Sequence, residues 1–159
     1  MRKKRMLIEG AAYHVTSRTN NKINVFEKKQ CQRIFLFILE EAQEKFCFEL
    51  INFCVMPTHV HLLIKPADGT ELPNIMQWIK TKSAKCWNRI KNTTDHFWGD
   101  RYFANAIQNE NEFETVMNYI DQNPVKAGLA ASPEDWKPSG AYLRSQDSEG
   151  VCRSYHLLI

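Results

Sequence analysis

Two histidines separated by one residue give the strongest chemical signal in this chain of 159 residues. They are His59 and His61, in the run MPTHVHLLI. If this run is a strand, alternation turns both imidazoles to one face and Val60, Leu62 and Ile64 to the other. Because the aliphatic face must be buried, we expect the histidines on the open face, where one divalent metal ion can take a nitrogen from each. Two ligands do not complete a site, and the pattern alone also fits a strand with two idle histidines.

A tyrosine and an asparagine one helical turn apart form a second candidate group. The apolar spacing at 110–122 predicts a helix that ends there, because Pro124 disfavours helical geometry at the preceding residue. On such a helix, Tyr119 and Asn123 lie together at one edge of the buried stripe. A phenol can attack an electrophile that a metal ion polarises, and an amide oxygen suits Mg²⁺ or Mn²⁺ beside imidazole. From the residues alone, a packed ring with a solvated hydroxyl is the commoner role for such a tyrosine.

The elements that must position these groups follow an order typical of a small α+β domain. Strands are predicted at four β-forming runs, 11–18, 48–55, 59–65 and 101–107. Helices are predicted at two runs with apolar residues at helical spacing, 27–46 and 72–90. The resulting βαββαβ order predicts a ferredoxin-like antiparallel sheet with helices on one face, followed by an extra helix that bears the tyrosine. The other face of the sheet is then available for a site.

The overall composition predicts one intracellular globular domain. At 43% hydrophobic and 11% aromatic residues, the chain can bury a core without a disulfide framework. Five cysteines, odd in number and without a C-x-x-C pair, favour reduced thiols over a zinc ribbon. No apolar run is long enough for a membrane span, and the basic start lacks the apolar region of a signal peptide. We expect a single domain over 1–159, with a core at about 11–145 and a flexible tail at 146–159.

The charge of the chain permits a polyanionic partner without requiring one. The net charge is +3 and the isoelectric point about 8.6. Candidate phosphate contacts are the basic arm and four later cations, namely Arg2, Lys3, Lys4, Arg5, Arg18, Lys82, Lys85 and Arg101. Tyr13, Trp98 and Tyr102 are candidates for stacking on unpaired bases. The alternatives are solvated charges for the basic runs and core packing for the aromatic residues.

Four ordered blocks of the sequence resemble one known family. The blocks are YHVTSR at 13–18, VMPTHVHLLI at 55–64, WGDRYF at 98–103 and YIDQNPVKAGL at 119–129. In this order they resemble the REP-associated tyrosine transposases, a branch of the HUH superfamily related to the single-tyrosine transposases of small bacterial insertion sequences. A lone His-x-His motif is weak evidence for a family. The ordered set of four blocks is strong evidence, and it covers roughly residues 11–142. One departure is Thr58, where the family commonly has asparagine; threonine can still hydrogen-bond, so the metal assignment is unaffected.

The resemblance implies a single-stranded DNA endonuclease and strand transferase that cuts beside a hairpin, either a REP-like element or an insertion-sequence end. It makes His59, His61 and Asn123 the ligands of Mg²⁺ or Mn²⁺. It makes Tyr119 the nucleophile, which forms a 5′-phosphotyrosine link and releases a 3′-hydroxyl. It also implies a bacterial, cytoplasmic, nucleoid-associated protein without a membrane partner. The oligomeric state can be a monomer or a homodimer. Insertion-sequence relatives are dimers that share the tyrosine helix between subunits, whereas members of the REP-associated branch look monomeric.

Two other functions fit parts of the pattern. A replication-initiator or relaxase-like HUH nuclease would share the histidine pair and the tyrosine, but not the Tyr-Ile-x-x-Asn-Pro block. A non-catalytic, nucleic-acid-binding ferredoxin-like module would leave the histidines idle. Covalent attachment of DNA to the protein separates the second of these from both nucleases.

Overall fold

The computed structural model describes residues 8–147, and its four strands form one antiparallel sheet in the order β2-β3-β1-β4. The strands are β1 (Tyr13–Arg18), β2 (Phe48–Met56), β3 (His59–Pro66) and β4 (Phe103–Ala106). The helices are α1 (Lys29–Lys45), α2 (Leu72–Lys91), α3 (Glu110–Lys126) and α4 (Gly140–Gln146). Three short 3-10 turns are η1 (Asn20–Lys22), η2 (Val25–Glu27) and η3 (Pro133–Asp135). This order and connectivity confirm the predicted ferredoxin-like sheet; the basic arm at 2–5 and residues 148–159 of the expected tail lie outside the described residues.

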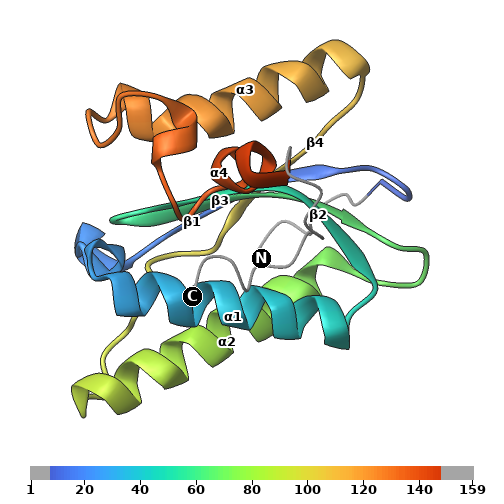
Figure 1. Ribbon diagram of the computed structural model, residues 1–159. Coiled ribbons are helices and arrows are strands. Elements are labelled where there is room, and N and C mark those ends of the chain that lie inside the picture. The colour runs from blue at the N-terminus through green and yellow to red at the C-terminus, as the bar shows by residue number, and fades with distance from the viewer. Residues whose placement is uncertain (1–7, 148–159) are drawn as a thin grey trace.

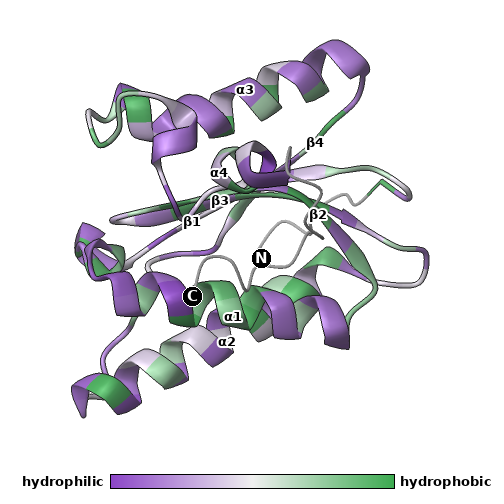
Figure 2. Ribbon diagram, in the orientation of Figure 1, coloured by the Kyte–Doolittle hydropathy of each residue, from purple (hydrophilic) through white to green (hydrophobic). Residues whose placement is uncertain are grey.

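Helices α1 and α2 cover one face of the sheet (Figure 1). Both helices are amphipathic, and Figure 2 shows hydrophobic and hydrophilic stretches alternating along them. The strands meet them with every second residue, because side chains alternate between the faces of a strand. The buried side chains of this layer include Val15, Val60, Leu62 and Ile64. The aliphatic residues that flank the histidines are therefore buried as predicted.

Helix α3 lies over the opposite face of the same sheet (Figure 1). Its residue Ile120 is fully buried in a small second core with Cys54, Met56 and Leu63 of the sheet. The face that carries the histidines is thus partly covered by the helix that carries Tyr119. This packing fixes the tyrosine helix against the sheet instead of leaving it as an independent appendage.

The N-terminus of α3 has a typical capping residue, whereas the predicted position of its C-terminus is wrong. Asn109 caps the first turn, where its side chain accepts a hydrogen bond from the backbone of Glu112. The predicted end at residue 122 is wrong, because the helix continues through a buried Pro124 to Lys126. Proline here lies in the last turn, so it removes only one backbone hydrogen bond, and its burial against the second layer offsets that loss.

Candidate active site

His59 and His61 lie on the same face of β3, as the alternation predicts, and face residues of β1 across the sheet. The Cα of His61 pairs with Thr16 and that of His59 pairs with Arg18. The expectation of an open face is wrong for His61, which is only 4% exposed. The rings of His14 and Tyr119 lie against it, with centroids at 5.3 Å and 5.6 Å. The site is therefore a cluster that is buried at His61 and partly covered by α3.

Hydrogen bonds to the Nδ1 atoms orient both imidazole rings. The Nδ1 of His61 lies 3.0 Å from the Nε2 of His14 and 3.2 Å from the Oγ1 of Thr16. The Nδ1 of His59 lies 3.0 Å from the Oγ1 of Thr58, so threonine does provide the hydrogen bond expected at this position. The Nε2 of His61 is buried and has no hydrogen-bond partner among residues 8–147. A buried nitrogen without a partner is unfavourable unless a ligand occupies it, so its chemistry fits a metal ion.

The three imidazoles of the cluster are held in the neutral form at neutral pH. Burial, with further contributions from His59, His14 and Arg18, lowers the pKa of His61 to about 3. Burial and the nearby Arg18 guanidinium lower the pKa of His59, and burial lowers the pKa of His14. A neutral imidazole offers a nitrogen lone pair to a cation, whereas a protonated one repels it.

Tyr119 lies at the border between this cluster and solvent. Its side chain is 42% exposed, and its ring centroid is 5.6 Å from that of His61 and 5.7 Å from that of His14. The ammonium group of Lys126, two turns further along α3, lies 5.5 Å from the centroid of the tyrosine ring. The nucleophile candidate, two imidazoles and one cation therefore meet within a single chain.

Asn123 lies one turn after Tyr119 and is half-buried. Its amide nitrogen donates a 2.7 Å hydrogen bond to the carbonyl of Tyr119, which leaves the side-chain oxygen as its remaining polar group. Within the described part of the chain, no three His, Cys, Asp or Glu side chains are grouped so that they could hold a metal ion. A metal ion held by His59 and His61 would need a third protein ligand of another type, and an amide oxygen on the tyrosine helix has suitable chemistry.

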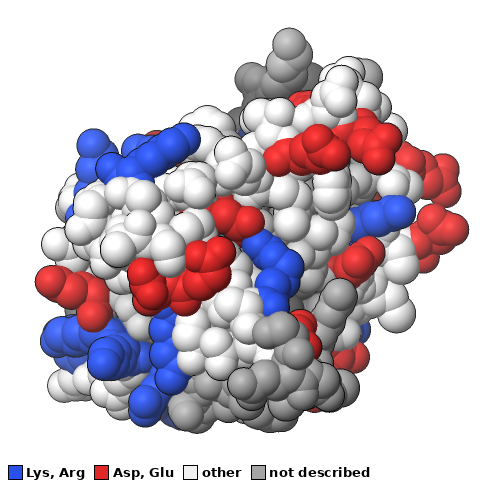
Figure 3. Space-filling model, turned by 45° about the horizontal axis from the view of Figure 1, so that its top comes forward, with Lys and Arg blue, Asp and Glu red and all other residues white. Residues whose placement is uncertain are grey.

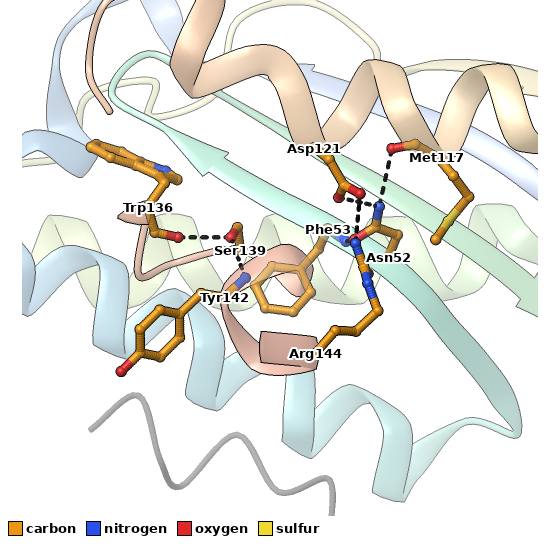
Figure 4. Close-up of polar contacts among 8 residues, drawn as sticks. All are labelled: Asn52, Phe53, Met117, Asp121, Trp136, Ser139, Tyr142 and Arg144. Atoms are coloured by element: carbon orange, nitrogen blue, oxygen red, sulfur yellow. Dashed lines mark hydrogen bonds and ion pairs between the residues drawn. The ribbon is translucent and has the colours of Figure 1, made fainter. Parts of the chain in front are cut away.

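A polar network fastens α3 to β2 and α4 close to Tyr119 (Figure 4). The buried Asn52 donates a 2.9 Å hydrogen bond to Asp121 and accepts a 3.0 Å bond from Arg144. Arg144 also forms a 2.6 Å ion pair with Asp121. A Cβ at Gly140 would collide with the Asn52 side chain, so glycine is required where α4 begins. The network fixes Asp121, two residues after the tyrosine.

We expect Asn52→Ala to lower the free energy of unfolding by about 2 kcal/mol, because it leaves buried polar partners unsatisfied. Arg144→Ala should cost less than about 1 kcal/mol, because the Arg144 side chain is 40% exposed and its ion pair is screened by solvent. Urea unfolding of the two variants measures both values. A larger loss from Arg144→Ala than from Asn52→Ala would contradict the view that the buried amide, more than the ion pair, holds α3 in place.

The predicted phosphate contacts separate into different regions. Arg18 lies beside the histidines on the face that α3 covers. Lys82 forms a 2.5 Å ion pair with Glu41 in the α1–α2 layer, and Lys85 lies on the same helix α2. Arg101 is exposed in the segment before β4. The α2 lysines therefore lie in the layer across the sheet from the cluster, and the arm at Arg2, Lys3, Lys4 and Arg5 lies outside the described residues.

The aromatic residues predicted as candidates for base stacking belong to the core instead. Tyr13, Trp98 and Tyr102 are each at most 8% exposed. The indole nitrogen of Trp98 donates a 2.9 Å hydrogen bond to Ser83, which fixes the ring inside the α2 layer. Stacking on DNA by these three residues is therefore excluded in this conformation.

Three residues of the cluster were not identified from the sequence as site residues, namely His14, Thr16 and Lys126. Period-two alternation places His14 and Thr16 on one face of β1, but only the register against β3 brings them to His61. The spacing of seven residues places Lys126 on the same side of α3 as Tyr119, two turns away. Because Pro124 led to a predicted helix end at residue 122, this position of Lys126 was not expected, and it follows from the continuation of α3 through the proline.

The charge on this side of the molecule is unevenly distributed. Figure 3 shows one group of acidic side chains at the upper right of the view and another at the left. Glu110, Glu112 and Glu114 lie in the first turns of α3, whereas the exposed Lys126 lies in its last turn. Acidic residues in the first turns and a cation in the last turn both interact favourably with the helix dipole. Among residues 8–147, none of the helices combines the length and the hydrophobicity that a membrane span requires.

Comparison with known proteins agrees with the fold. A protein of Escherichia coli K12 named REP-associated tyrosine transposase is 24% identical over 139 residues, 84% of this chain and 78% of its own length. A protein of Haemophilus influenzae that carries the same name with a provisional qualifier is 27% identical over 120 residues, which are 69% of this chain and 68% of its own length. The structure of a REP-associated tyrosine transposase bound to a REP hairpin superimposes with a TM-score of 0.75 at 21% identity, covering 96% of this chain and 88% of that one. Residues 8–123 match the family described as Transposase IS200 like, so the chain belongs to that family.

Proposed function

We propose that this protein is a metal-dependent, single-tyrosine nuclease and strand transferase that acts on single-stranded DNA beside a hairpin. The observation that carries the proposal is the buried Nε2 of His61, which has no partner among the described residues and lies in a ring cluster with Tyr119. Family membership supports transposase chemistry, and the hairpin bound to the structurally similar protein supports the substrate class.

In this proposal, His59, His61 and Asn123 would hold Mg²⁺ or Mn²⁺. When bound, such an ion would offset the negative charge of the phosphodiester that is to be cleaved. His14 and Thr16 contact the Nδ1 side of His61, which leaves its Nε2 as the nitrogen that would bind the ion. The chain therefore contributes both the ligands and the hydrogen bonds that orient one of them.

The tyrosine performs the chemical step. The phenolic oxygen of Tyr119 attacks the phosphorus, a bond forms between them, and the bond from phosphorus to the 3′-oxygen breaks. The phenol loses its proton and the departing 3′-oxygen gains one, so the products are a 5′-phosphotyrosine and a 3′-hydroxyl. The reverse reaction with another 3′-hydroxyl rejoins strands and frees the tyrosine.

Two cations of the chain flank this reaction centre. Arg18 pairs across the sheet with His59, and Lys126 lies over the ring of Tyr119. In the proposed complex they contact phosphates on either side of the cleaved bond and compensate their charge. All of these groups come from one chain, which supports a monomer as the active unit.

The proposal is tested with a labelled DNA hairpin that carries a single-stranded flank, incubated with the full chain and Mn²⁺. We expect a labelled protein band that survives denaturing electrophoresis, and no such band after chelation of the metal. A hairpin that is shifted on a native gel but never becomes covalently attached would instead support a non-catalytic DNA-binding module.

A further inference from the structure

An exposed aromatic residue lies on the edge strand of the sheet. Phe103 in β4 is 71% exposed, more than any other large hydrophobic side chain in the described chain. Its neighbours Tyr102 and Ala104 turn to the buried side and pack in or against the main core. Since a large ring in water is unfavourable, such strong exposure on a rigid strand points to a ligand that covers it.

The register of the sheet places Phe103 on the same face as the histidine cluster. The Cα of Phe103 pairs with Thr16 of β1, and Thr16 pairs in turn with His61 of β3. Residues directly opposite one another share a face, so the three side chains form a row across the sheet. With strands about 4.8 Å apart, Phe103 lies roughly 10 Å from His61 along this row.

The surroundings of Phe103 favour a nucleotide over an apolar partner. Arg18 is exposed on the same face, two residues along β1 from Thr16. The next residue of β4 on this face is Asn105, an exposed amide. An aromatic ring with a guanidinium on one side and an amide on the other fits a nucleotide. The base stacks on the aromatic face whatever its identity, and the guanidinium is placed for the phosphate.

We propose that Phe103 is the stacking platform for an unpaired base of the DNA strand next to the cleaved phosphodiester. This inference rests on the proposed function and adds to it the residue that positions the single-stranded flank. Phe103 takes the role for which the buried Tyr13, Trp98 and Tyr102 are unavailable. It acts on binding of the flank and does not take part in bond breakage.

The test measures DNA binding in the Tyr119→Phe background, so that no cleavage intervenes. We expect Phe103→Ala to weaken binding of a hairpin with a single-stranded flank about 5- to 150-fold, the range for loss of one base–aromatic stack. Phe103→Trp should restore binding, and a blunt hairpin without the flank should bind all variants alike. Phe37→Ala, which removes a 50% exposed ring from α1, is the matched control and should have no effect.

A second measurement locates the base. In DNA with one abasic site moved along the flank, one position should abolish the difference between Phe103 and Phe103→Ala. The proposal is overturned if Phe103→Ala binds the flanked hairpin as well as the parent, or loses affinity equally for the blunt hairpin. It is also overturned if sedimentation shows that Phe103→Ala converts a dimer of the free protein to monomers, which would make this edge a contact between copies. Failure of covalent attachment by the parent chain, with flank binding still dependent on Phe103, would overturn the proposed catalysis alone.

Discussion

Tyr119→Phe is expected to reduce covalent DNA attachment by at least about four orders of magnitude, because it removes the only proposed nucleophile. The change deletes one oxygen from a side chain that is 42% exposed, so the fold and the ring packing against His61 should persist. Binding of the hairpin should therefore change little. Denaturing gels of labelled DNA measure the first quantity, and native gels of the same reactions measure the second.

Tyr142→Phe is the matched control for this experiment. Tyr142 lies in α4 and packs against the main core, away from the histidine cluster. It should retain full covalent attachment. Cleavage by Tyr119→Phe at a rate near that of the parent would remove Tyr119 from the mechanism and leave the cluster as a DNA-binding feature.

His61→Ala is expected to weaken Mn²⁺ binding by more than about 100-fold, because loss of a direct ligand exceeds the effect of losing a residue that only orients one. The Nε2 of His61 is the buried side-chain nitrogen without a hydrogen-bond partner among the described residues, so a metal ion bound there would face little competition from solvent. Covalent DNA attachment should fall with metal affinity. Calorimetric titration with Mn²⁺ measures the binding directly.

Since His61 is buried, its replacement can also destabilise the fold, so two further variants serve as controls. His59→Ala replaces a more exposed proposed ligand and should also weaken Mn²⁺ binding, with the fold checked by circular dichroism. His96→Ala removes an exposed histidine from the segment after α2 and should leave the affinity unchanged. Unchanged Mn²⁺ affinity in folded His61→Ala and His59→Ala proteins would exclude the proposed metal centre.

Local sequence patterns predicted the fold because each element has a regular period. The alternation around His59 and His61 predicted a strand with one aliphatic face, and Val60, Leu62 and Ile64 are indeed buried. The i, i+4 spacing also placed Asn123 next to Tyr119, where the two share a hydrogen bond. The order of strands and helices then limited the topology to a ferredoxin-like sheet.

The parts of the site that the sequence did not predict depend on contacts between distant segments. His14 reaches His61 only through the pairing of β1 with β3, forty-seven residues apart in sequence. The burial of His61 depends on how α3 docks on the sheet, which no local period encodes. Strand pairing likewise decided which aromatic side chain of the 98–103 block is exposed: it buries Trp98 and Tyr102 and leaves Phe103 in solvent.

Mass spectrometry of the covalent complex tests the central claim most directly. After reaction of the full chain with a flanked hairpin and Mn²⁺, the protein and the DNA are both digested. The account predicts a single modified peptide, in which a nucleotide is joined through its 5′-phosphate to the phenolic oxygen of Tyr119. This peptide should form only when metal is present. A nucleotide on another residue, or modification that persists without metal, would contradict it.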